Sequence, residues 1–303
     1  MQEGSRRAVI TAFAANLGIA VAKFVAYGFT GAASMLAEAV HSVADTGNQG
    51  LLLLGSRRAQ RQATREHPFG YGRERYFWAF VVALVLFTLG SLFAIYEGVE
   101  KLRHPHVLTS PAWAIGVLAL AMIFEALAFR TAFIEANRLR GRQGWLRFIR
   151  RAKSPELPVI LLEDLGALLG LSFALAGVGL ALATGDPRFD ALGSMAIGLL
   201  LGAIAILLAS EMKSLLIGES VSSEHRARIV SAIEAAPSVR QLIDMRTQHL
   251  GPDQLLLCMK VEFDRGLDMA GIARAIDTME DGLRATVEGE LLIYVEPDIK
   301  RSA

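Results

Sequence analysis

The segment LPVILLEDLGALLGLSFALAGVGLALAT, residues 157–184, is a long apolar stretch that carries two adjacent acidic residues, Glu163 and Asp164. A helix needs about 20 mainly apolar residues to cross a bilayer, and this segment exceeds that length. Ionisable groups at membrane depth are costly, so they usually face a cavity, a partner or an ion. The segment therefore predicts a membrane-spanning helix that carries chemistry.

Five other stretches have the length and composition of a membrane span, roughly 8–29, 34–56, 76–100, 111–136 and 189–216. The chain is 53% hydrophobic and only 20% charged, which is less charge than a soluble domain of 303 residues normally carries. The first apolar stretch is too long for a signal-peptide core, and no cleavage-like site follows it. We therefore expect an α-helical membrane protein with six transmembrane helices.

Basic residues concentrate in alternate connections between these stretches. Arginines cluster before the first span, in 57–75 and in 138–153, whereas the linkers 30–33, 101–110 and 185–188 hold only Lys101, Arg103 and Arg188. The positive-inside rule then predicts that both termini are cytoplasmic. The net charge of +1 gives no indication of nucleic-acid binding, and the single cysteine, Cys258, excludes an internal disulfide.

From about residue 217 the sequence takes on the pattern of a small soluble domain. A helical pattern ends at Pro237, two strand-like runs flank Gly251–Gln254, an amphipathic helix follows from Asp268, and 291–297 reads as a last strand. The order αββαβ predicts an α+β, ferredoxin-like cytoplasmic domain. We therefore expect a transmembrane domain over 1–216 and a cytoplasmic dimerisation domain over 217–303.

The second predicted span carries four polar residues on one helical face: Glu38, His41, Asp45 and Asn48. His41 and Asp45, one turn apart, can present a nitrogen and an oxygen to a single cation. Together with Glu163 and Asp164 they would form a mixed N/O site, which suits tetrahedral Zn²⁺, while Co²⁺, Fe²⁺, Ni²⁺ and Mn²⁺ accept similar ligands. The alternative is that these groups only hold helices together.

The roles of three acidic residues are left open by the sequence. Neighbouring helical residues point about 100° apart, so at most one of Glu163 and Asp164 can aim squarely at a partner helix. Glu125, in the predicted fourth span, is either a proton carrier or the partner of a buried cation.

Four ordered motifs resemble those of the cation diffusion facilitator family, closest to the branch of the mitochondrial solute-carrier zinc transporter. They are SMLAEAVHSVADTGNQGLLLLG (34–55), HPFGYGRERY (67–76), LLEDLGALLG (161–170) and FDALGSMAIGLLLG (189–202). The resemblance implies a homodimeric antiporter that exchanges a divalent metal, usually Zn²⁺, for protons. It also implies that the second and fifth spans hold the metal and that the C-terminal domain pairs the protomers.

Carried over by position, His41 and Asp45 match the first two metal ligands of the family, and Asp164 matches the fourth. The third position falls on Ile160, which cannot bind metal, and Glu163 is its natural substitute. The expected metal ligands are thus His41, Asp45, Glu163 and Asp164.

Two other family sites depart from the pattern. His67 matches a second metal position of some relatives, but Tyr71 stands where another histidine would be. In the C-terminal domain the positions that bind zinc in some relatives read Met259, Tyr294 and Glu296. We therefore expect a dimerisation domain with little or no metal.

The sequence thus predicts a proton-coupled antiporter that exports Zn²⁺ from the cytoplasm, with Mn²⁺, Co²⁺, Fe²⁺ and Cd²⁺ as further candidate cargoes. It predicts no enzyme, no bound cofactor and no nucleic-acid partner. The expected partners are divalent metal, protons, membrane lipid and a second copy, and the expected location is the bacterial inner membrane. Two alternatives remain: a transport-deficient scaffold or regulator, for which Ile160 speaks, and an intramembrane metalloenzyme, for which no His-Glu-x-x-His pattern is present.

Overall fold

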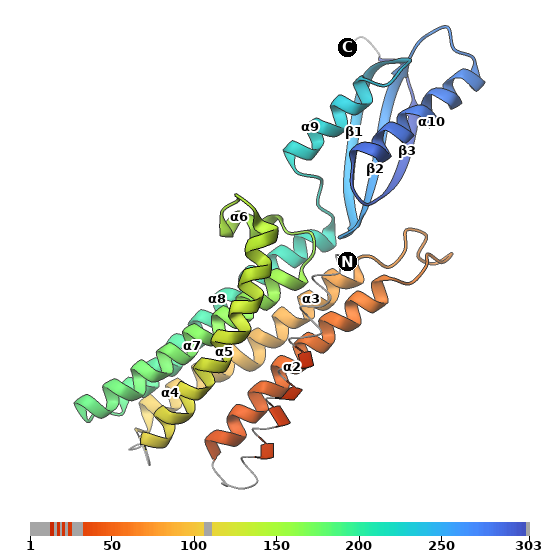
Figure 1. Cartoon of the computed structure of the whole chain (residues 1–303). Helices are drawn as coiled ribbons and strands as arrows, with labels where there is room; N and C mark the ends of the chain where they lie inside the picture. Colours follow the sequence, from red (N-terminus) through yellow and green to blue (C-terminus); the bar gives the residue numbers. More distant parts are fainter. Residues whose placement is uncertain are drawn as a thin grey trace. The chain divides into compact units, whose positions relative to one another are not determined.

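A computed structural model describes residues 13–14, 17–18, 20–21, 24–25, 33–105 and 111–300, and it divides into two compact units. We call Met1–Arg58 with Arg75–Lys213 the helical unit, and Ala59–Glu74 with Ser214–Ala303 the sheet unit (Figure 1). Most of the predicted first span, 8–29, lies outside the described residues.

The helical unit is built from long helices that run side by side (Figure 1). Its elements are α2 (Ala33–Ala59), α3 (Glu74–Val85), the π-helix η1 (Leu86–Leu92), α4 (Phe93–Arg103), α5 (Pro111–Arg140), α6 (Trp145–Arg151), α7 (Glu156–Thr184) and α8 (Arg188–Ile217).

Three of the described helical stretches are long and apolar enough to cross a membrane: Glu74–Arg103, Glu156–Thr184 and Arg188–Ile217. They coincide with the predicted third, fifth and sixth spans. Helices α2 and α5 cover the predicted second and fourth spans. The structure therefore confirms an integral membrane protein by length and composition, and the full count of six spans stays a prediction.

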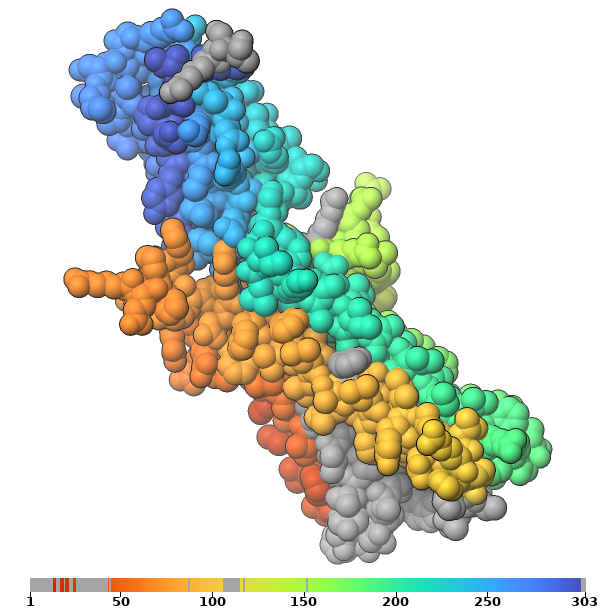
Figure 2. Space-filling model, turned by 180° about the vertical axis from the view of Figure 1, so that it is seen from behind, coloured from red at the N-terminus to blue at the C-terminus, as the bar shows by residue number. Residues whose placement is uncertain are grey.

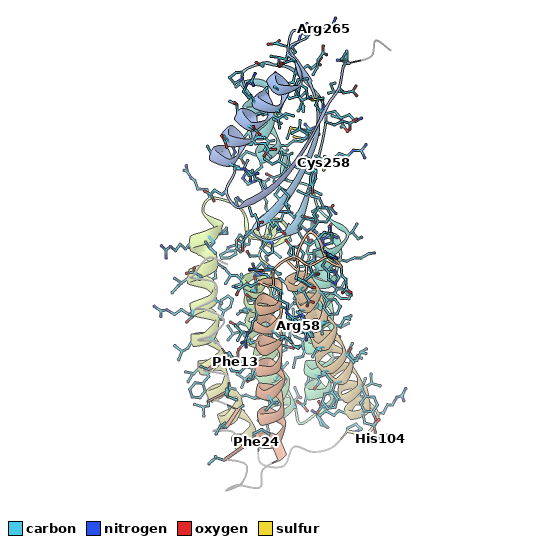
Figure 3. The ribbon with its side chains drawn as sticks, turned by 90° about the vertical axis from the view of Figure 1, so that its right-hand side faces the viewer. Phe13, Phe24, Arg58, His104, Cys258 and Arg265 are labelled. Carbon is cyan, nitrogen blue, oxygen red and sulfur yellow. The ribbon has the colours of Figure 1, made fainter. Side chains whose placement is uncertain are left out.

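The arrangement of the helices agrees with alternating chain direction. Phe24 and His104 lie at the same end of the helical unit (Figure 3), as expected if the predicted first and third spans both end on that side. The opposite ends of α2 and α5 carry basic residues in their last turns: Arg57 and Arg58, and Arg138 and Arg140.

Small residues allow α8 to approach its neighbours closely. A Cβ atom on Gly198 would lie 2.9 Å from the backbone oxygen of Ser91, and one on Gly166 of α7 would lie 3.0 Å from Cδ1 of Ile204. Ser91 Oγ, within η1, donates a hydrogen bond to the Gly198 oxygen at 2.8 Å. Figure 2 shows Glu74–Arg103 and Arg188–Ile217 side by side along the unit. At these positions a side chain larger than that of glycine would collide with the neighbouring helix.

The sheet unit contains the predicted αββαβ order. Its elements are α9 (Ser223–Glu234), β1 (Val239–Gly251), β2 (Gln254–Phe263), α10 (Met269–Thr286) and β3 (Glu290–Pro297). The sheet has the order β1-β2-β3, with β2 antiparallel to β1 and parallel to β3. The α+β order is confirmed for the described residues, while the ferredoxin-like assignment of this three-stranded sheet stays a prediction.

The two faces of β2 have different surroundings because successive strand residues point to opposite sides. Leu257 and Val261 face the helices and are fully buried in a core with Ile233 of α9 and Leu283 of α10. Cys258, which Figure 3 places among the strands, alternates with these core residues.

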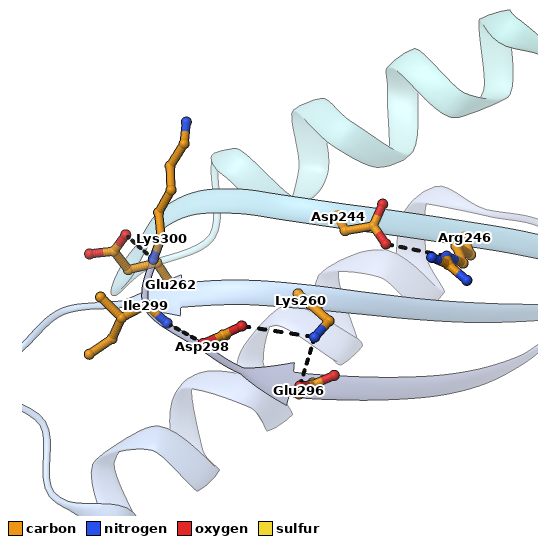
Figure 4. A network of polar contacts seen from close by, with 8 residues as sticks. All are labelled: Asp244, Arg246, Lys260, Glu262, Glu296, Asp298, Ile299 and Lys300. Carbon is orange, nitrogen blue, oxygen red and sulfur yellow. Dashed lines mark hydrogen bonds and ion pairs between the residues drawn. The ribbon is translucent and has the colours of Figure 1, made fainter. Parts of the chain in front are cut away.

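Polar side chains lie at the positions between the core residues and bond to each other within and between strands (Figure 4). Lys260 Nζ donates to Glu296 Oε1 at 2.9 Å, across the parallel β2–β3 pairing. Arg246 Nε donates to Asp244 Oδ2 at 3.3 Å along β1. These exposed pairs lie in the domain for which we predicted a role in dimerisation.

Candidate functional site

Four carboxyl groups from three helices converge inside the helical unit. Glu163 and Asp164 of α7 are only 7% and 8% exposed. Glu163 interacts electrostatically with Asp45 of α2, and Asp164 interacts with both Asp45 and Glu125 of α5. Helix α5, which carries Glu125, packs against α7. The predicted residues Asp45, Glu163 and Asp164 are thus brought together, and Glu125 joins them.

Asn48 connects the same helices by a direct bond. Its Nδ2 donates a hydrogen bond to Glu163 Oε1 at 2.9 Å, and its side chain is only 3% exposed. Asn48 lies one turn beyond Asp45 on the polar face that the sequence predicts for α2. Sequence reasoning placed Asn48 on this face without giving it a role, because the spacing does not show which group it meets on α7.

Two oxygens of this pair are left without a donor. Within the described part of the chain, Asn48 Oδ1 and Glu163 Oε2 are buried and receive no hydrogen bond from an N–H or O–H group. A buried acceptor without a donor loses its hydration and gains nothing in exchange. A proton or a cation between these oxygens would restore the missing interaction.

The carboxyl groups themselves call for positive charge. Asp45 lies within hydrogen-bond reach of Glu163. Two carboxyl groups can share such a contact only when one of them holds a proton or when both face a cation. Like charges repel strongly where the surroundings exclude water. The arrangement can therefore take up either a cation or protons, one in place of the other.

The complete ligand set goes beyond what the described residues contain. The side chain of His41 lies outside them, although its backbone is part of α2. Among the described side chains, no three His, Cys, Asp or Glu residues form a group that could hold a metal ion. Ile160, at the third ligand position of the resemblance, is buried and apolar. The four-residue ligand set is carried forward as a proposal.

Helix α7 also carries one residue of a buried ion pair that the sequence analysis did not predict. Arg75 of α3 is bonded to Glu156, the first residue of α7: Nε to Oε1 at 2.5 Å and Nη2 to Oε2 at 2.9 Å. Both side chains are at most 5% exposed. Counting Arg75 among the basic residues of a connecting loop was therefore wrong. A partner 81 positions away in the chain leaves no local signal.

The other positions singled out in the sequence lie in the sheet unit. His67 is exposed and packs edge-on against Tyr71, with 4.7 Å between ring centroids. Met259 is buried in the core, Tyr294 is exposed, and Glu296 is bonded to Lys260. These side chains thus have packing or surface contacts of their own.

Comparison with known proteins gives a consistent result. A family model described as the cation efflux transmembrane domain matches residues 9–217. The mitochondrial proton-coupled zinc antiporter SLC30A9 of Mus musculus is 33% identical over 264 residues, which are 86% of this chain and 47% of that protein. Its Homo sapiens counterpart is 34% identical over 86% of this chain and 46% of its own length.

A bacterial relative matches over more of its length. The cation-efflux pump FieF of Klebsiella pneumoniae (strain 342) is 26% identical over 293 residues, 96% of this chain and 92% of the pump. By contrast, the chain spans about half the length of the two mitochondrial relatives.

The family model covers more than half of the chain, and the relatives carry the names of transporters. This supports the prediction that the chain is no enzyme. The motifs of α2 and α7 had indicated the same family and the same branch. The chain belongs to the cation efflux family, that of the cation diffusion facilitators, in the branch that includes the mitochondrial zinc antiporters.

Proposed function

We propose that the chain is a proton-coupled antiporter of divalent cations that exports Zn²⁺ from the cytoplasm. The observation that carries the proposal is the group formed by the buried Glu163 and Asp164 with the half-buried Asp45, in which two oxygens of Glu163 and Asn48 lack a donor among the described residues. The names of the mitochondrial relatives, which describe proton-coupled zinc antiporters, support the same cargo.

The proposed coupling needs only one site. Metal binds deprotonated imidazole and carboxylate groups, so its arrival releases protons and its departure takes them up. With His41, Asp45, Glu163 and Asp164 as ligands, a cation and protons compete for the same atoms. Protons arriving from the far side would displace the metal, and the proton gradient would drive export.

The proposed architecture has six spans, with the second and fifth forming the site. The basic ends of α2 and α5 support cytoplasmic termini by the positive-inside rule. We further propose domains over 1–216 and 217–303, pairing of two copies through the second, and a place in the bacterial inner membrane. The match to a bacterial pump supports that location.

The test is metal flux into proteoliposomes with an imposed pH gradient. Asp45→Asn and Glu163→Gln should each reduce Zn²⁺ flux by about 100-fold or more, because each removes a charged ligand from a buried site. Glu100→Gln, on an exposed position of α4, is the matched control and should transport like the parent chain. Parent-like flux through Glu163→Gln would refute the site, and an inactive parent chain would refute the function.

A second candidate is a scaffold or regulator that does not transport. It is favoured by Ile160, a buried apolar residue at the third ligand position. Zinc binding by the purified chain, compared with His41→Ala, separates the two. A transporter binds zinc and loses affinity in the variant, whereas a scaffold of this kind shows no binding at the site in either chain.

A further inference from the structure

We infer that Asn48 is itself a ligand of the transported cation, through its carboxamide oxygen, and that its amide nitrogen holds Glu163 in place beside it. The inference rests on the proposed function, because it names an additional residue of the same site. It assigns two tasks to one side chain, each to a different atom.

The first task follows from the bond that is present. Asn48 Nδ2 donates to Glu163 Oε1 at 2.9 Å, and both side chains are more than nine-tenths buried. An amide donor fixes one carboxylate oxygen and leaves the other available. Glu163 Oε2 is that other oxygen, and none of the described groups donates to it.

The second task follows from the oxygen that has no partner. Asn48 Oδ1 is buried and accepts no hydrogen bond from the part of the chain that the structure describes. Carboxamide and carboxylate oxygens are ordinary ligands of divalent cations. Asn48 Oδ1 and Glu163 Oε2 are the two remaining oxygens of one bonded pair of side chains, and a shared cation would satisfy both.

The neighbours divide the two acidic residues of α7 between two helices. Glu163 interacts with Asp45 and Asn48, which both belong to α2. Asp164 has Glu125 of α5 as its leading charged neighbour and Asp45 after it. Since adjacent helical residues point about 100° apart, Glu163 faces α2 more directly. Asn48 therefore accompanies Glu163, the residue that replaces the missing ligand at Ile160.

An added oxygen ligand has a consequence for metal choice. Zn²⁺ favours four ligands with nitrogen or sulfur among them, whereas Mn²⁺ accepts more ligands and favours oxygen. A site with the Asn48 oxygen should therefore admit Mn²⁺ better than the same site without it. Asn48 would set selectivity as well as affinity.

The experiment compares three variants of the full chain in proteoliposomes, with Zn²⁺ and Mn²⁺ uptake and with metal binding in detergent. Asn48→Ala should raise KM for Zn²⁺ about tenfold and that for Mn²⁺ more, the range seen when a partner of a metal site is removed. Asn48→Asp keeps an oxygen at this position and should bind Zn²⁺ within about threefold of the parent chain. Gln49→Ala, at the adjacent buried amide, should behave like the parent chain.

The outcomes are separable. A KM like that of the parent chain for both metals in Asn48→Ala would overturn the inference. An equal loss of affinity in Asn48→Ala and Asn48→Asp would overturn it too, because Asn48 would then only position Glu163. If Asn48→Ala does not purify as a folded protein, Asn48→Asp decides alone, since loss of metal binding there contradicts the ligand role. A parent chain that neither binds nor transports metal would instead overturn the proposed function.

Discussion

Glu156 and Glu163 stand two turns apart on α7, and their side chains are almost equally shielded, at 1% and 7% exposed. Their partners differ completely. Glu156 is held by the guanidinium of Arg75 through two hydrogen bonds. Among the described residues, Glu163 has one amide donor, from Asn48, and its charged neighbours are the acidic residues Asp45 and Asp164.

The difference shows why burial alone does not identify a site. A buried carboxylate that meets a guanidinium in bidentate geometry is charge-balanced within the protein, so it orders the helices around it. A buried carboxylate surrounded by others of its kind is balanced only when something positive arrives. Glu156 therefore holds α3 and α7 together, whereas Glu163 has the surroundings of the cation ligand that we propose.

The largest effect should come from breaking the balanced pair. Arg75→Ala leaves Glu156 as an unpaired buried charge, which typically costs about 3–5 kcal/mol. Replacing both partners together, as Arg75→Met with Glu156→Leu, should cost much less because no charge is then stranded. Thermal or denaturant unfolding of the full chain measures both, and Arg150→Ala is the control.

Arg150 and Glu211 form a looser pair at 3.7 Å, with the Arg150 side chain 58% exposed. An exposed pair of this kind contributes at most about 1 kcal/mol. If Arg75→Ala destabilised the chain no more than Arg150→Ala, the Arg75–Glu156 pair would not be the fixed contact that we infer.

An intermediate effect on stability is expected when a cation binds beside Glu163, whose charge no described basic residue balances. Zn²⁺ at about 100 times its Kd should stabilise the parent chain by about 2.7 kcal/mol, since it binds the folded state alone. Chelation should remove this gain. In Glu163→Ala the gain should disappear, while the metal-free variant should be no less stable than the parent, because one of several repelling carboxylates is gone.

Unfolding temperatures with and without Zn²⁺ measure both effects, and Glu100→Gln should keep the parent's response. A metal-free Glu163→Ala chain that unfolded as readily as Arg75→Ala would show that Glu163 has a structural role like that of Glu156.

The same contrast shows what the sequence could reveal. Helical spacing placed Asp45 and Asn48 on one face, and apolar length located the helix that carries Glu163, because both patterns are local. Strand alternation and turn residues likewise predicted the αββαβ order. The partners of Arg75 and Glu163 could not be predicted, since each bond joins residues more than 80 positions apart in the chain.

Two other structural features, the burial of Arg75 and the π-helix, have no local sequence pattern that predicts them. The positive-inside rule counts every arginine alike, so it assigned Arg75 to a basic loop. In the structure Arg75 is buried and its charge is paired with Glu156. The π-helical stretch Leu86–Leu92, where Ser91 meets α8, has the composition of an ordinary apolar helix. Such features depend on contacts between helices rather than on sequence period.

The smallest effect on stability is expected from an ion pair that is exposed to solvent, Lys260 with Glu296. On the sheet, the hydrogen bond and the charge of Glu296 raise the pKa of Lys260 above its ordinary value of 10.5. A lysine whose pKa is raised by folding adds stability that is complete below its unfolded pKa and is lost as the pH rises through the folded value. Lys260→Met should therefore lower the unfolding temperature slightly at pH 7, and the difference should shrink as the pH rises through the raised pKa of Lys260.

Arg246→Met is the matched control, since the Arg246–Asp244 pair is also exposed but a guanidinium keeps its charge in this range. Its small effect should persist at the alkaline pH where that of Lys260→Met has shrunk. Calorimetry of the full chain at pH 7 and at increasing alkaline pH gives both comparisons. An effect of Lys260→Met that stayed the same across this range would assign its contribution to packing of the lysine stem rather than to charge, and would place Lys260 outside the series.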